Sequence, residues 1–517
     1  MNLPLAKKVI EAVVSSGVRE FCVCAGARNS PLVYLLNAAK GIELYSFFEE
    51  RSASFFALGR IQATGQPVAV VTTSGTAVAE LLPASVEANY SGLPLLMITA
   101  DRPRSYRGTG APQSIEQVGI FSQYVETCWD LADTEDILPI QEWTQKRPLQ
   151  INLCFSEPLI EDIIPCLDFR DAAKVTKPNL ASLSLPFKRS LAKPMVICGS
   201  LPTTMGAEIK KRIINLLIQM NAPVYAEALS GLRGESQLSH LLLSGGENSV
   251  QEIFEKNLCQ SVFRIGGVPT LRFWRDLEDK YKNVPVYSIS ENDYPGLSRR
   301  VHHVVGFQHL NSFESTGENS HSEVFRLDSN RRENLQALLN KHSKSEATLL
   351  ADLAKKLQGH SVFLGNSMPI REWDLVASPQ WHYARLAGHR GANGIDGQVS
   401  GFLGWCQTEA ENWCLVGDLT ALYDLQALWI KPQMKPKKVR IVVVNNGGGQ
   451  IFKRTFENDF FLNRHNLDFS SWAEMWKWPY LKWSAIPENL NLPDFVLIEL
   501  NPDQDQSDQF WKEWRRK

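Results

Sequence analysis

The sequence predicts an α/β protein of three domains with largely parallel sheets. Short apolar runs alternate with amphipathic helical stretches along all 517 residues, which is typical of α/β layers. A chain of this length exceeds what a single hydrophobic core serves. Two polar stretches, at about 168–191 and 306–345, interrupt the alternation, and we interpret them as linkers. The predicted domains are therefore 1–167, 190–310 and 345–517.

Each predicted domain contains apolar runs that end in small or polar residues, as buried parallel strands do. A helical pattern follows each run in the first domain. The expected strands lie within residues 18–26, 67–73 and 93–101 of the first domain, 193–200, 222–234, 261–270 and 284–290 of the second, and 361–367, 412–418 and 439–446 of the third.

Composition excludes several classes of protein. The net charge is −2 and Lys and Arg are scattered, so nucleic acid is not an expected partner. No run of about 18 apolar residues is present, and the N-terminus lacks the apolar core and cleavage site of a secretory signal, so we expect a cytoplasmic protein without a membrane span. Most of the nine cysteines lie in apolar runs without a CxxC pair, which favours reduced buried thiols over disulfides or a zinc site.

The strongest chemical pattern lies in the third domain. Gly417 and Asp418 close one apolar run, a helical pattern with leucines at 419, 422, 425 and 428 follows, and a second run ends in Asn445-Asn446 and three glycines. Residues 419–444, 26 in number, separate Asp418 from Asn445. A carboxylate, an amide oxygen and a loop carbonyl are the hard oxygen ligands that Mg²⁺ takes when it also binds phosphates. Glycines and a helix N-terminus favour an anion at the same sheet edge. The pattern predicts a diphosphate held through a metal ion.

A second pattern lies in the first domain, where two glutamates stand among four phenylalanines at the junction of a predicted strand and helix, residues 46–59. An apolar setting raises the pKa of a carboxyl group and suits it to proton transfer. Alone, Glu49 and Glu50 would equally fit the first turn of a helix, where the dipole favours negative charge.

Taken together, these patterns resemble the thiamine-diphosphate-dependent enzymes, which carry Gly-Asp, a gap of this size, and Asn-Asn. More narrowly, the chain is similar to the 2-succinyl-5-enolpyruvyl-6-hydroxy-3-cyclohexene-1-carboxylate synthase family of menaquinone biosynthesis, from Val9 to Leu500. The matching segments are Gly26-Ala27-Arg28-Asn29-Ser30-Pro31-Leu32, Thr72-Thr73-Ser74-Gly75-Thr76-Ala77, Thr99-Ala100-Asp101-Arg102-Pro103, Leu229-Ser230-Gly231-Leu232-Arg233, Gly365-Asn366-Ser367, Arg390-Gly391-Ala392-Asn393-Gly394-Ile395-Asp396-Gly397, Gly417-Asp418-Leu419-Thr420-Ala421-Leu422 and Gln450-Ile451-Phe452.

The resemblance implies three doubly wound domains, with a pyrimidine-binding domain first, a central domain, and a diphosphate- and metal-binding domain last. It implies thiamine diphosphate and Mg²⁺ as cofactors, with Mn²⁺ as an alternative ion. The metal ligands would be Asp418, Asn446 and the Gly448 carbonyl, with Asn445 as the rival to Asn446. Further cofactor contacts would come from Glu50, Ser367, Ile395, Gly417 and Leu419.

The family match selects Glu50 as the catalytic acid beside the aminopyrimidine ring, with Gln113 and Ile395 also in the catalytic set. The implied reaction removes CO₂ from 2-oxoglutarate and adds the remaining four-carbon unit to isochorismate by conjugate addition. Both substrates are dicarboxylates, and arginine binds carboxylates through two parallel hydrogen bonds. The candidate substrate residues are Arg28, Arg102, Arg272, Asn366, Ser367, Arg371, Arg390, Ile451 and Phe452, of which Arg272 is the weakest because the family position is often lysine.

The resemblance also implies a homodimer or homotetramer, with each active site shared between subunits. Two departures, Ala27 for the usual serine and Pro112 for asparagine, bear on substrate contacts. The alternatives are another thiamine-diphosphate enzyme of 2-oxo acids, such as an acetohydroxyacid synthase or a decarboxylase, and a non-catalytic binding protein that keeps the fold. An NAD-dependent oxidoreductase is disfavoured because no G-x-G-x-x-G follows a predicted strand.

Overall fold

The computed structural model describes residues 2–160, 164–171, 189–316, 321–453, 456 and 458–516. The chain folds into two compact units. Unit 1 comprises Met1–Pro178, His389–Thr408 and Leu422–Pro436, and unit 2 comprises Asn179–Gly388, Glu409–Ala421 and Lys437–Lys517. Two segments of the predicted third domain, 389–408 and 422–436, thus fold with the first. The boundaries 1–167, 190–310 and 345–517 remain predictions.

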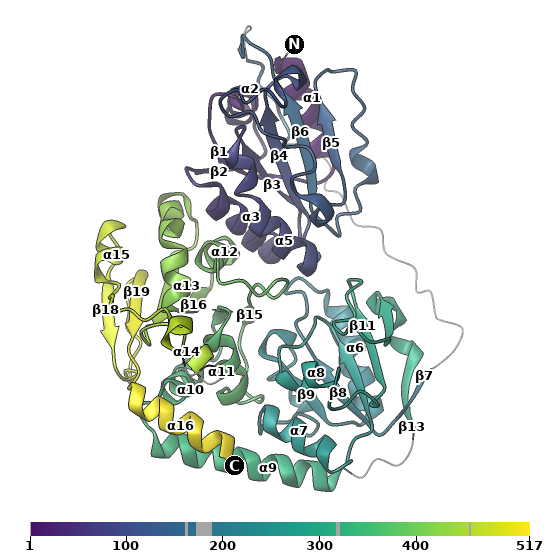
Figure 1. Ribbon diagram of the computed structural model, residues 1–517, viewed down its shortest axis with the longest axis vertical. Helices are drawn as coiled ribbons and strands as arrows, with labels where there is room; N and C mark the ends of the chain where they lie inside the picture. The colour runs from purple at the N-terminus through teal and green to yellow at the C-terminus, as the bar shows by residue number, and fades with distance from the viewer. Residues whose placement is uncertain are drawn as a thin grey trace. The chain divides into compact units, whose positions relative to one another are not determined.

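Unit 1 contains a six-stranded parallel sheet with the order β2-β1-β3-β4-β6-β5 (Figure 1). Its strands are β1 (Glu20–Cys24), β2 (Glu43–Phe47), β3 (Val68–Thr72), β4 (Leu95–Asp101), β5 (Cys128–Leu131) and β6 (Leu149–Cys154). Its helices are α1 (Asn2–Ser15), α2 (Ser30–Ala38), α3 (Glu50–Thr64), α4 (Thr76–Ala79), α5 (Leu82–Ser91) and α12 (Gln398–Trp405), with 3₁₀ turns η1 (Arg104–Tyr106), η2 (Ser122–Tyr124), η3 (Ile140–Glu142) and η7 (Leu425–Gln433). The strand order reverses between β1 and β3, which marks a ligand position in doubly wound sheets.

Helices α3 and α12 of unit 1 approach each other unusually closely. A Cβ built on Gly59 would lie 1.9 Å from the Gly401 carbonyl oxygen, and one on Gly404 would lie 2.1 Å from the Phe56 carbonyl oxygen. Glycines therefore set the distance between the two helices. This contact places the segment that carries Ile395 against the helix that begins at Glu50.

Unit 2 contains two larger parallel sheets. The first, β12-β11-β10-β8-β9, consists of β8 (Pro194–Cys198), β9 (Val224–Ala226), β10 (Ser261–Ile265), β11 (Val286–Ser290) and β12 (His302–Val305). The second, β15-β14-β16-β17-β19-β18, consists of β14 (Ser361–Leu364), β15 (Arg385–Ala387), β16 (Glu411–Gly417), β17 (Lys438–Val444), β18 (Tyr480–Trp483) and β19 (Phe495–Leu500). A two-stranded sheet pairs β7 (Arg189–Ala192) with β13 (Phe313–Thr316).

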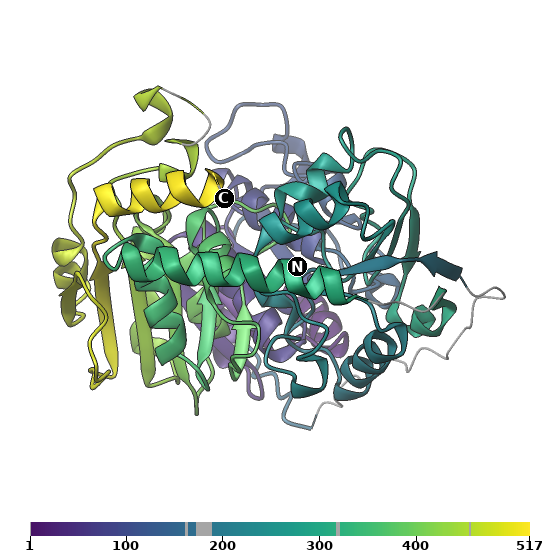
Figure 2. The same cartoon turned by 90° about the horizontal axis from the view of Figure 1, so that it is seen from below.

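The helices of unit 2 are α6 (Ala207–Met220), α7 (Glu247–Glu255), α8 (Arg272–Asp276), α9 (Ser322–Lys341), α10 (Glu346–Lys356), α11 (Met368–Val376), α14 (Gln450–Lys453), α15 (Ser470–Met475) and α16 (Gln504–Arg516), with 3₁₀ turns η4 (Ala228–Ser230), η5 (Ser236–Leu238), η6 (Phe307–Ser312) and η8 (Asp459–Leu462). Helix α13 (Asp418–Tyr423) carries the chain from unit 2 into unit 1. Helices α9 and α16 lie side by side (Figure 1, Figure 2).

The predicted fold class is confirmed. All strand pairs among the described residues are parallel. The two six-stranded sheets repeat one order, in which the second strand lies outside the first and the sixth lies between the fourth and fifth. Every predicted strand is present, because each apolar run is buried between helical layers; β3 and β4, for example, are buried throughout.

The helical stretch expected after Asp418 is present, but it is not one regular helix. Helix α13 ends at Tyr423, and Asp424 leaves helical geometry with φ −129° before the chain continues as η7. The Asp424 carboxylate is buried and accepts hydrogen bonds from Ser400 N (2.7 Å) and Ser400 Oγ (2.9 Å). The three-residue leucine spacing matches the period of a 3₁₀ helix, in which residues three apart align.

The prediction of a second linker is wrong. Residues 306–345 contain η6, β13 and the 20-residue helix α9, which buries Leu327, Leu335 and Leu338 along one face. Ser322, Glu323, Ser329, Asn330 and Glu333 are polar residues of α9 that remain exposed. Of the first predicted linker, residues 172–188 lie outside the described residues, and β7 begins at Arg189. Among the helices described, none is long and apolar enough to cross a membrane.

Candidate cofactor and substrate site

The predicted diphosphate and metal residues meet at the carboxyl edge of the β14–β19 sheet in unit 2. Strand order reverses between β14 and β16, and ligands bind at such points in doubly wound sheets. Gly417 pairs with Val444 in the β16–β17 register, so Asp418 and Asn445 leave the sheet next to each other. Asn366 and Ser367 leave the same edge after β14. Three separate strands thus deliver the predicted polar residues to one place.

Asp418 organises the glycine loop through its carboxylate, which is buried with 2% of its surface exposed. Its Oδ1 accepts a hydrogen bond from Leu419 N (2.6 Å), and its Oδ2 accepts from Asn446 N (3.1 Å) and Gly448 N (2.9 Å). His465 Nε2 lies 3.3 Å from Oδ2. Burial raises the Asp418 pKa, and the backbone N–H groups oppose that shift. The carboxylate therefore fixes the loop after β17 against the start of α13.

The two neighbouring asparagines differ in their hydrogen bonds. Asn445 Nδ2 donates to Leu467 O (2.8 Å) and Glu499 Oε1 (3.0 Å), and its Oδ1 accepts from Gly447 N (3.3 Å). Asn446 Nδ2 donates to Glu346 Oε2 (2.9 Å), but its buried Oδ1 accepts no hydrogen bond from the described residues. A buried amide oxygen without a donor is costly unless something else satisfies it. Asn446 is therefore the asparagine with an oxygen to offer a ligand.

The residues present fit a hard divalent cation. Asp418 supplies a carboxylate, Asn446 an amide oxygen that meets no donor among the described residues, and the loop at Gly448 a backbone carbonyl. Gly448 has φ +132°, and a Cβ there would lie 2.4 Å from the Leu462 carbonyl oxygen, so only glycine fits. Among the described residues no group of three or more His, Cys, Asp or Glu is placed to hold a metal. A site with few charged ligands suits an ion that also binds phosphate oxygens.

Ser367 stands at the start of α11 in strained backbone geometry, with φ 73° and ψ −128°. Non-glycine residues at positive φ concentrate at binding sites, where the surrounding fold imposes them. Asn366 beside it is 1% exposed, and Pro369 in the first turn favours the helix start. The N-terminus of α11, a nine-residue helix, thus opens beside the loop after β17, residues 445–449. We call this loop the metal loop because it carries two of the predicted metal ligands.

The predicted catalytic acid lies in unit 1. Glu50 begins α3, three residues after β2 ends at Phe47, as expected from the sequence. Glu49 is the N-cap residue, and it accepts from Ser52 N (2.7 Å) and Gln426 Nε2 (3.0 Å). Burial raises the pKa of Glu50; its own backbone N–H partly offsets the shift, and the charges of Glu49 and Glu80 add to it. The Glu49 carboxylate is thus engaged in capping the helix, and the assignment of Glu50 as the acid stays a prediction.

Two further candidates in unit 1 are fixed by backbone carbonyls. Arg28 is buried, donates to Phe155 O (2.9 Å) and lies 3.0 Å from a Glu157 carboxylate oxygen. Arg102 donates to Pro112 O (2.8 Å) and lies over the ring of Tyr106. Arg102 therefore ties down the loop that presents Gln113.

Gln113 itself is exposed, with φ 55°. The buried Gln117 beside it accepts from Gly75 N (2.9 Å) and donates to Ala100 O (3.1 Å) and Asn152 Oδ1 (2.9 Å). Gly75 in turn lies against Gln113, 3.3 Å from a built Cβ to the Gln113 Cα. Gln117 thus joins the Gln113 loop to β4 and β6, a role that only the folded chain reveals.

The segment that carries Arg390 and Ile395 is held in unit 1 by Glu87. The buried Glu87 carboxylate accepts from Gly391 N (2.7 Å) and Ala392 N (2.7 Å). Burial raises the pKa of Glu87, and these hydrogen bonds and the nearby Arg390 charge oppose that rise. Ile395 is half-buried. Sequence reasoning missed Glu87, because nothing local links it to a loop 300 residues away.

Two of the candidate arginines in unit 2 line one cavity of about 820 Å³. Arg371 on α11 donates to Thr270 O (3.2 Å), and Arg272 on α8 lies 3.7 Å from Asp276. Two tryptophans of α16, Trp511 and Trp514, line the same cavity. The structure thus brings Arg272 and Arg371 together, although 98 residues separate them in the sequence.

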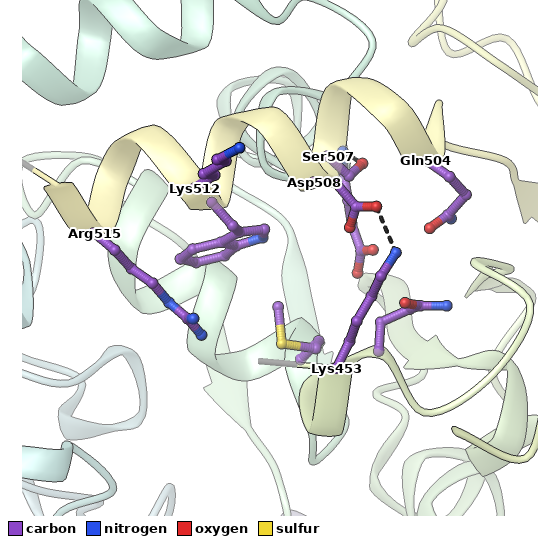
Figure 3. Close-up of a pocket in the computed structure, with 10 residues that line it drawn as sticks. Lys453, Gln504, Ser507, Asp508, Lys512 and Arg515 are labelled. Carbon is purple, nitrogen blue, oxygen red and sulfur yellow. Dashed lines mark hydrogen bonds and ion pairs between the residues drawn. The ribbon is translucent and has the colours of Figure 1, made fainter. Parts of the chain in front are cut away.

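A second cavity of about 510 Å³ lies between α16 and the metal loop (Figure 3). Glu346, Met368 and Gln450 contribute to its lining, and Lys453 of α14 forms an ion pair with Asp508 of α16 across it. The predicted substrate residues Ile451, half-buried, and Phe452, 43% exposed, belong to the same short helix α14.

The candidates therefore form two groups, each within one unit. The group in unit 1 contains Arg28, Glu50, Arg102, Gln113, Arg390 and Ile395, and the group in unit 2 contains Arg272, Asn366, Ser367, Arg371, Gly417, Asp418, Leu419, Asn446, Gly448, Ile451 and Phe452.

Comparison with known proteins identifies the family of the chain. Residues 4–120 match the family model described as thiamine pyrophosphate enzyme, N-terminal TPP binding domain. A protein of Bdellovibrio bacteriovorus named 2-succinyl-5-enolpyruvyl-6-hydroxy-3-cyclohexene-1-carboxylate synthase is 49% identical over 99% of this chain and 98% of its own length. This chain belongs to that synthase family. Relatives with the same name occur in Akkermansia muciniphila (36% identity, 98% of each chain) and Lysinibacillus sphaericus (30% identity, 98% of this chain and 97% of the relative).

Membership of the synthase family confirms the predicted enzyme class. The protein is a thiamine pyrophosphate-dependent enzyme, and the matched N-terminal region contains Glu50. The alternative of a non-catalytic binding protein loses its support, because the chain belongs to a family of synthases.

Proposed function

We propose that the protein is a cytoplasmic enzyme of menaquinone biosynthesis that removes CO₂ from 2-oxoglutarate and joins the remaining four-carbon unit to isochorismate. The product is 2-succinyl-5-enolpyruvyl-6-hydroxy-3-cyclohexene-1-carboxylate. The observation that supports this most is the near full-length similarity to synthases of that name, which are 49% and 36% identical to this chain. A second observation is the buried Asn446 Oδ1 of the metal loop, which accepts no hydrogen bond from the described residues.

The metal in this proposal is Mg²⁺, which Mn²⁺ can replace, held by Asp418, Asn446 and the Gly448 carbonyl. The cofactor is thiamine diphosphate, contacted also by Gly417, Leu419, Ser367 and Ile395. When bound, it supplies a reactive thiazolium carbon that makes loss of CO₂ from a 2-oxo acid feasible. The protein's part is to hold the diphosphate through the metal and to present the ring to the substrates.

Glu50 is the proposed catalytic acid. Its carboxyl group would hydrogen-bond a ring nitrogen of the aminopyrimidine and hold a proton there, which helps the adjacent amino group to act as a base. A carboxyl group does this best when its pKa is above the ordinary range, and burial raises the pKa of Glu50. Glutamine at this position would keep the shape but would lack the transferable proton.

Arginines account for the preference for two dicarboxylates. Arg272 and Arg371 share a cavity, so together they can bind carboxylate groups on one substrate. Arg28, Arg102 and Arg390 in unit 1 are held by protein carbonyls or lie beside a carboxylate, which fixes their direction. Asn366, Ser367, Gln113, Ile451 and Phe452 complete the proposed substrate contacts.

We further propose that the enzyme is a homodimer or a homotetramer with active sites at subunit interfaces. Glu50 belongs to unit 1 and Asp418 to unit 2, and one cofactor needs both an acid and a metal site. Sedimentation velocity would test the proposal, because a monomer at assay concentration that turns over substrate would contradict it.

A substrate comparison tests the proposed reaction. The purified protein with thiamine diphosphate and Mg²⁺ is given 2-oxoglutarate or pyruvate, each with and without isochorismate, while isochorismate absorbance is followed. The proposal predicts isochorismate loss with 2-oxoglutarate only. Consumption of pyruvate in place of 2-oxoglutarate would favour an acetohydroxyacid synthase or decarboxylase. If neither 2-oxo acid is consumed, the proposed reaction is refuted.

A further inference from the structure

Glu346 stands next to the metal loop, although nothing in its sequence surroundings connects it to that loop. It begins α10, directly after the N-cap residue Ser345, whose hydroxyl accepts from Thr348 N. Its side chain is almost fully buried, with 4% of the residue exposed, and it lines the 510 Å³ cavity between α16 and the loop (Figure 3). A buried carboxylate needs compensating donors, and Asn446 supplies one of them.

The contact between these residues determines which end of an amide faces the metal position. Asn446 Nδ2 donates to Glu346 Oε2 over 2.9 Å, across 100 residues of sequence. An asparagine side chain has a donor end and an acceptor end of nearly the same shape. Because the carboxylate accepts only from the donor end, Oδ1 must point the other way, where no donor from the part of the chain that the structure describes meets it.

We propose that Glu346 is a positioning residue that holds Asn446 with Oδ1 directed at the bound divalent cation. The inference rests on the proposed function, since it assumes that a metal binds at this loop. Without Glu346, the amide of Asn446 could rotate by half a turn and offer an NH₂ group, which repels a cation. Partners of this kind commonly orient metal ligands, and their loss costs about 10–100-fold in metal affinity.

The surroundings of Glu346 keep it in place. Its backbone N–H donates to Ser507 Oγ of α16 (3.0 Å), and Ser507 Oγ donates to Asp503 O (2.7 Å). Lys344, two residues before Glu346, donates its N–H to Gln506 Oε1 (2.9 Å). Figure 3 shows Ser507 on the side of α16 that faces the cavity. Helix α16 therefore holds the start of α10, and through it the orientation of Asn446.

The backbone of Asn446 is fixed separately, which isolates the role of Glu346. Asn446 N donates to Asp418, and Asn446 O accepts from Gln450 Nε2 (3.1 Å). Loss of Glu346 would therefore leave the loop in place and free only the amide. The rival explanation is electrostatic, because a buried negative charge attracts a cation whatever the amide does.

Mn²⁺ affinity in the presence of saturating thiamine diphosphate tests the proposal without reference to activity. Free Mn²⁺ is measured by electron paramagnetic resonance in the full-length protein and in its Glu346→Ala and Glu346→Gln variants. We expect Mn²⁺ binding about 10–100-fold weaker in Glu346→Ala. Glu346→Gln keeps an acceptor oxygen but no charge, so it should lose less. An equal loss in both variants would show a charge effect and overturn the positioning role.

A second pair of variants separates orientation from charge. In Asn446→Asp both terminal atoms are oxygens, so orientation no longer matters, and adding Glu346→Ala should not weaken Mn²⁺ binding further. The same fold-loss in this background as in the Asn446 protein would refute the proposal. The matched control is Glu247→Ala, which removes a half-buried glutamate from the first turn of α7 that accepts from Phe273 N (2.8 Å); its Mn²⁺ affinity should match the wild type.

The result also distinguishes failure of this inference from failure of the proposed function. A wild-type protein with no Mn²⁺ binding that depends on thiamine diphosphate would contradict the proposed function itself. Normal binding in the wild type and in every Glu346 variant would contradict only the role of Glu346. Circular dichroism and the melting temperature of each variant establish that the protein tested is folded.

Discussion

Replacement of Gly59 by alanine should destabilise unit 1, because α3 and α12 are in backbone contact there. The new Cβ would lie 1.9 Å from the Gly401 carbonyl oxygen and 2.8 Å from Trp405 N. Ordinary contacts begin at 3.4 Å, so the helices must separate by about 1.5 Å, the difference between 3.4 and 1.9 Å. Both obstacles are backbone atoms, which no side-chain rotation can move away.

The expected cost follows from two opposing effects. Overpacking typically costs about 1–3 kcal/mol, and backbone obstacles on a partner helix place Gly59→Ala at the upper end, about 3 kcal/mol. The better helix propensity of alanine returns about 1 kcal/mol. The net loss of about 2 kcal/mol corresponds to about 4–8 °C in the melting temperature of a unit of roughly 200 residues.

Differential scanning calorimetry measures this effect, with the lowest-temperature transition compared between variants. Gly206→Ala is the matched control, since Gly206 precedes α6, has φ −60°, and a Cβ there would meet nothing within 4 Å. The control should melt at or slightly above the wild-type temperature. A Gly59→Ala protein that melts no lower than the wild type would refute the account of α3–α12 packing.

Three further predictions concern single residues. Burial raises the pKa of Asp424 to about 6, despite hydrogen bonds from Ser400 and the nearby charge of Arg51. The folded state therefore holds a proton that the unfolded state releases near pH 4, so the free energy of unfolding should fall as the pH rises from about 4 to about 6. Asp424→Asn should flatten that part of a profile of melting temperature against pH. Asn446→Ala should abolish Mg²⁺-dependent binding of thiamine diphosphate in calorimetric titrations, whereas Asn445→Ala should lower the melting temperature and retain binding; the reverse result would identify Asn445 as the ligand. Gln117→Leu should leave the Gly75 N–H and the Ala100 carbonyl without partners and loosen the Gln113 loop. The expected loss is about 2–4 kcal/mol in the free energy of unfolding, measured by urea denaturation. An unchanged midpoint of unfolding would contradict this.

Features that depend on local sequence could be predicted. The buried strands were evident because parallel strands covered on both faces are largely apolar, as in β3 and residues 441–444 of β17. The junction of strand and helix at Glu50 followed from the phenylalanine pattern. The partnership of Asp418 with the loop after β17 followed from the adjacency of parallel strand ends, and Asp418 indeed accepts from the N–H groups of Asn446 and Gly448.

Features that depend on distant contacts could not be predicted. The helix after Asp418 breaks at Asp424 because Ser400, from another segment, captures its carboxylate. Helix α9 was missed because only one of its faces is apolar and the rest is rich in polar residues. Glu87 and Glu346 act on loops that lie far from them in sequence, and Gln117 ties its own loop to the distant strands β4 and β6. A glutamate at a helix start, such as Glu346, ordinarily indicates only capping.

The central claim, that this chain joins a decarboxylated 2-oxo acid to isochorismate, is tested most directly by the mass of the product. The wild-type protein and Glu50→Gln are incubated with thiamine diphosphate, Mg²⁺, isochorismate and uniformly ¹³C-labelled 2-oxoglutarate, and the products are analysed by mass spectrometry. The account predicts a product with the isochorismate skeleton plus four labelled carbons in the wild type, and none with Glu50→Gln. Labelled succinic semialdehyde without the joined product, or an equal yield from Glu50→Gln, would contradict it.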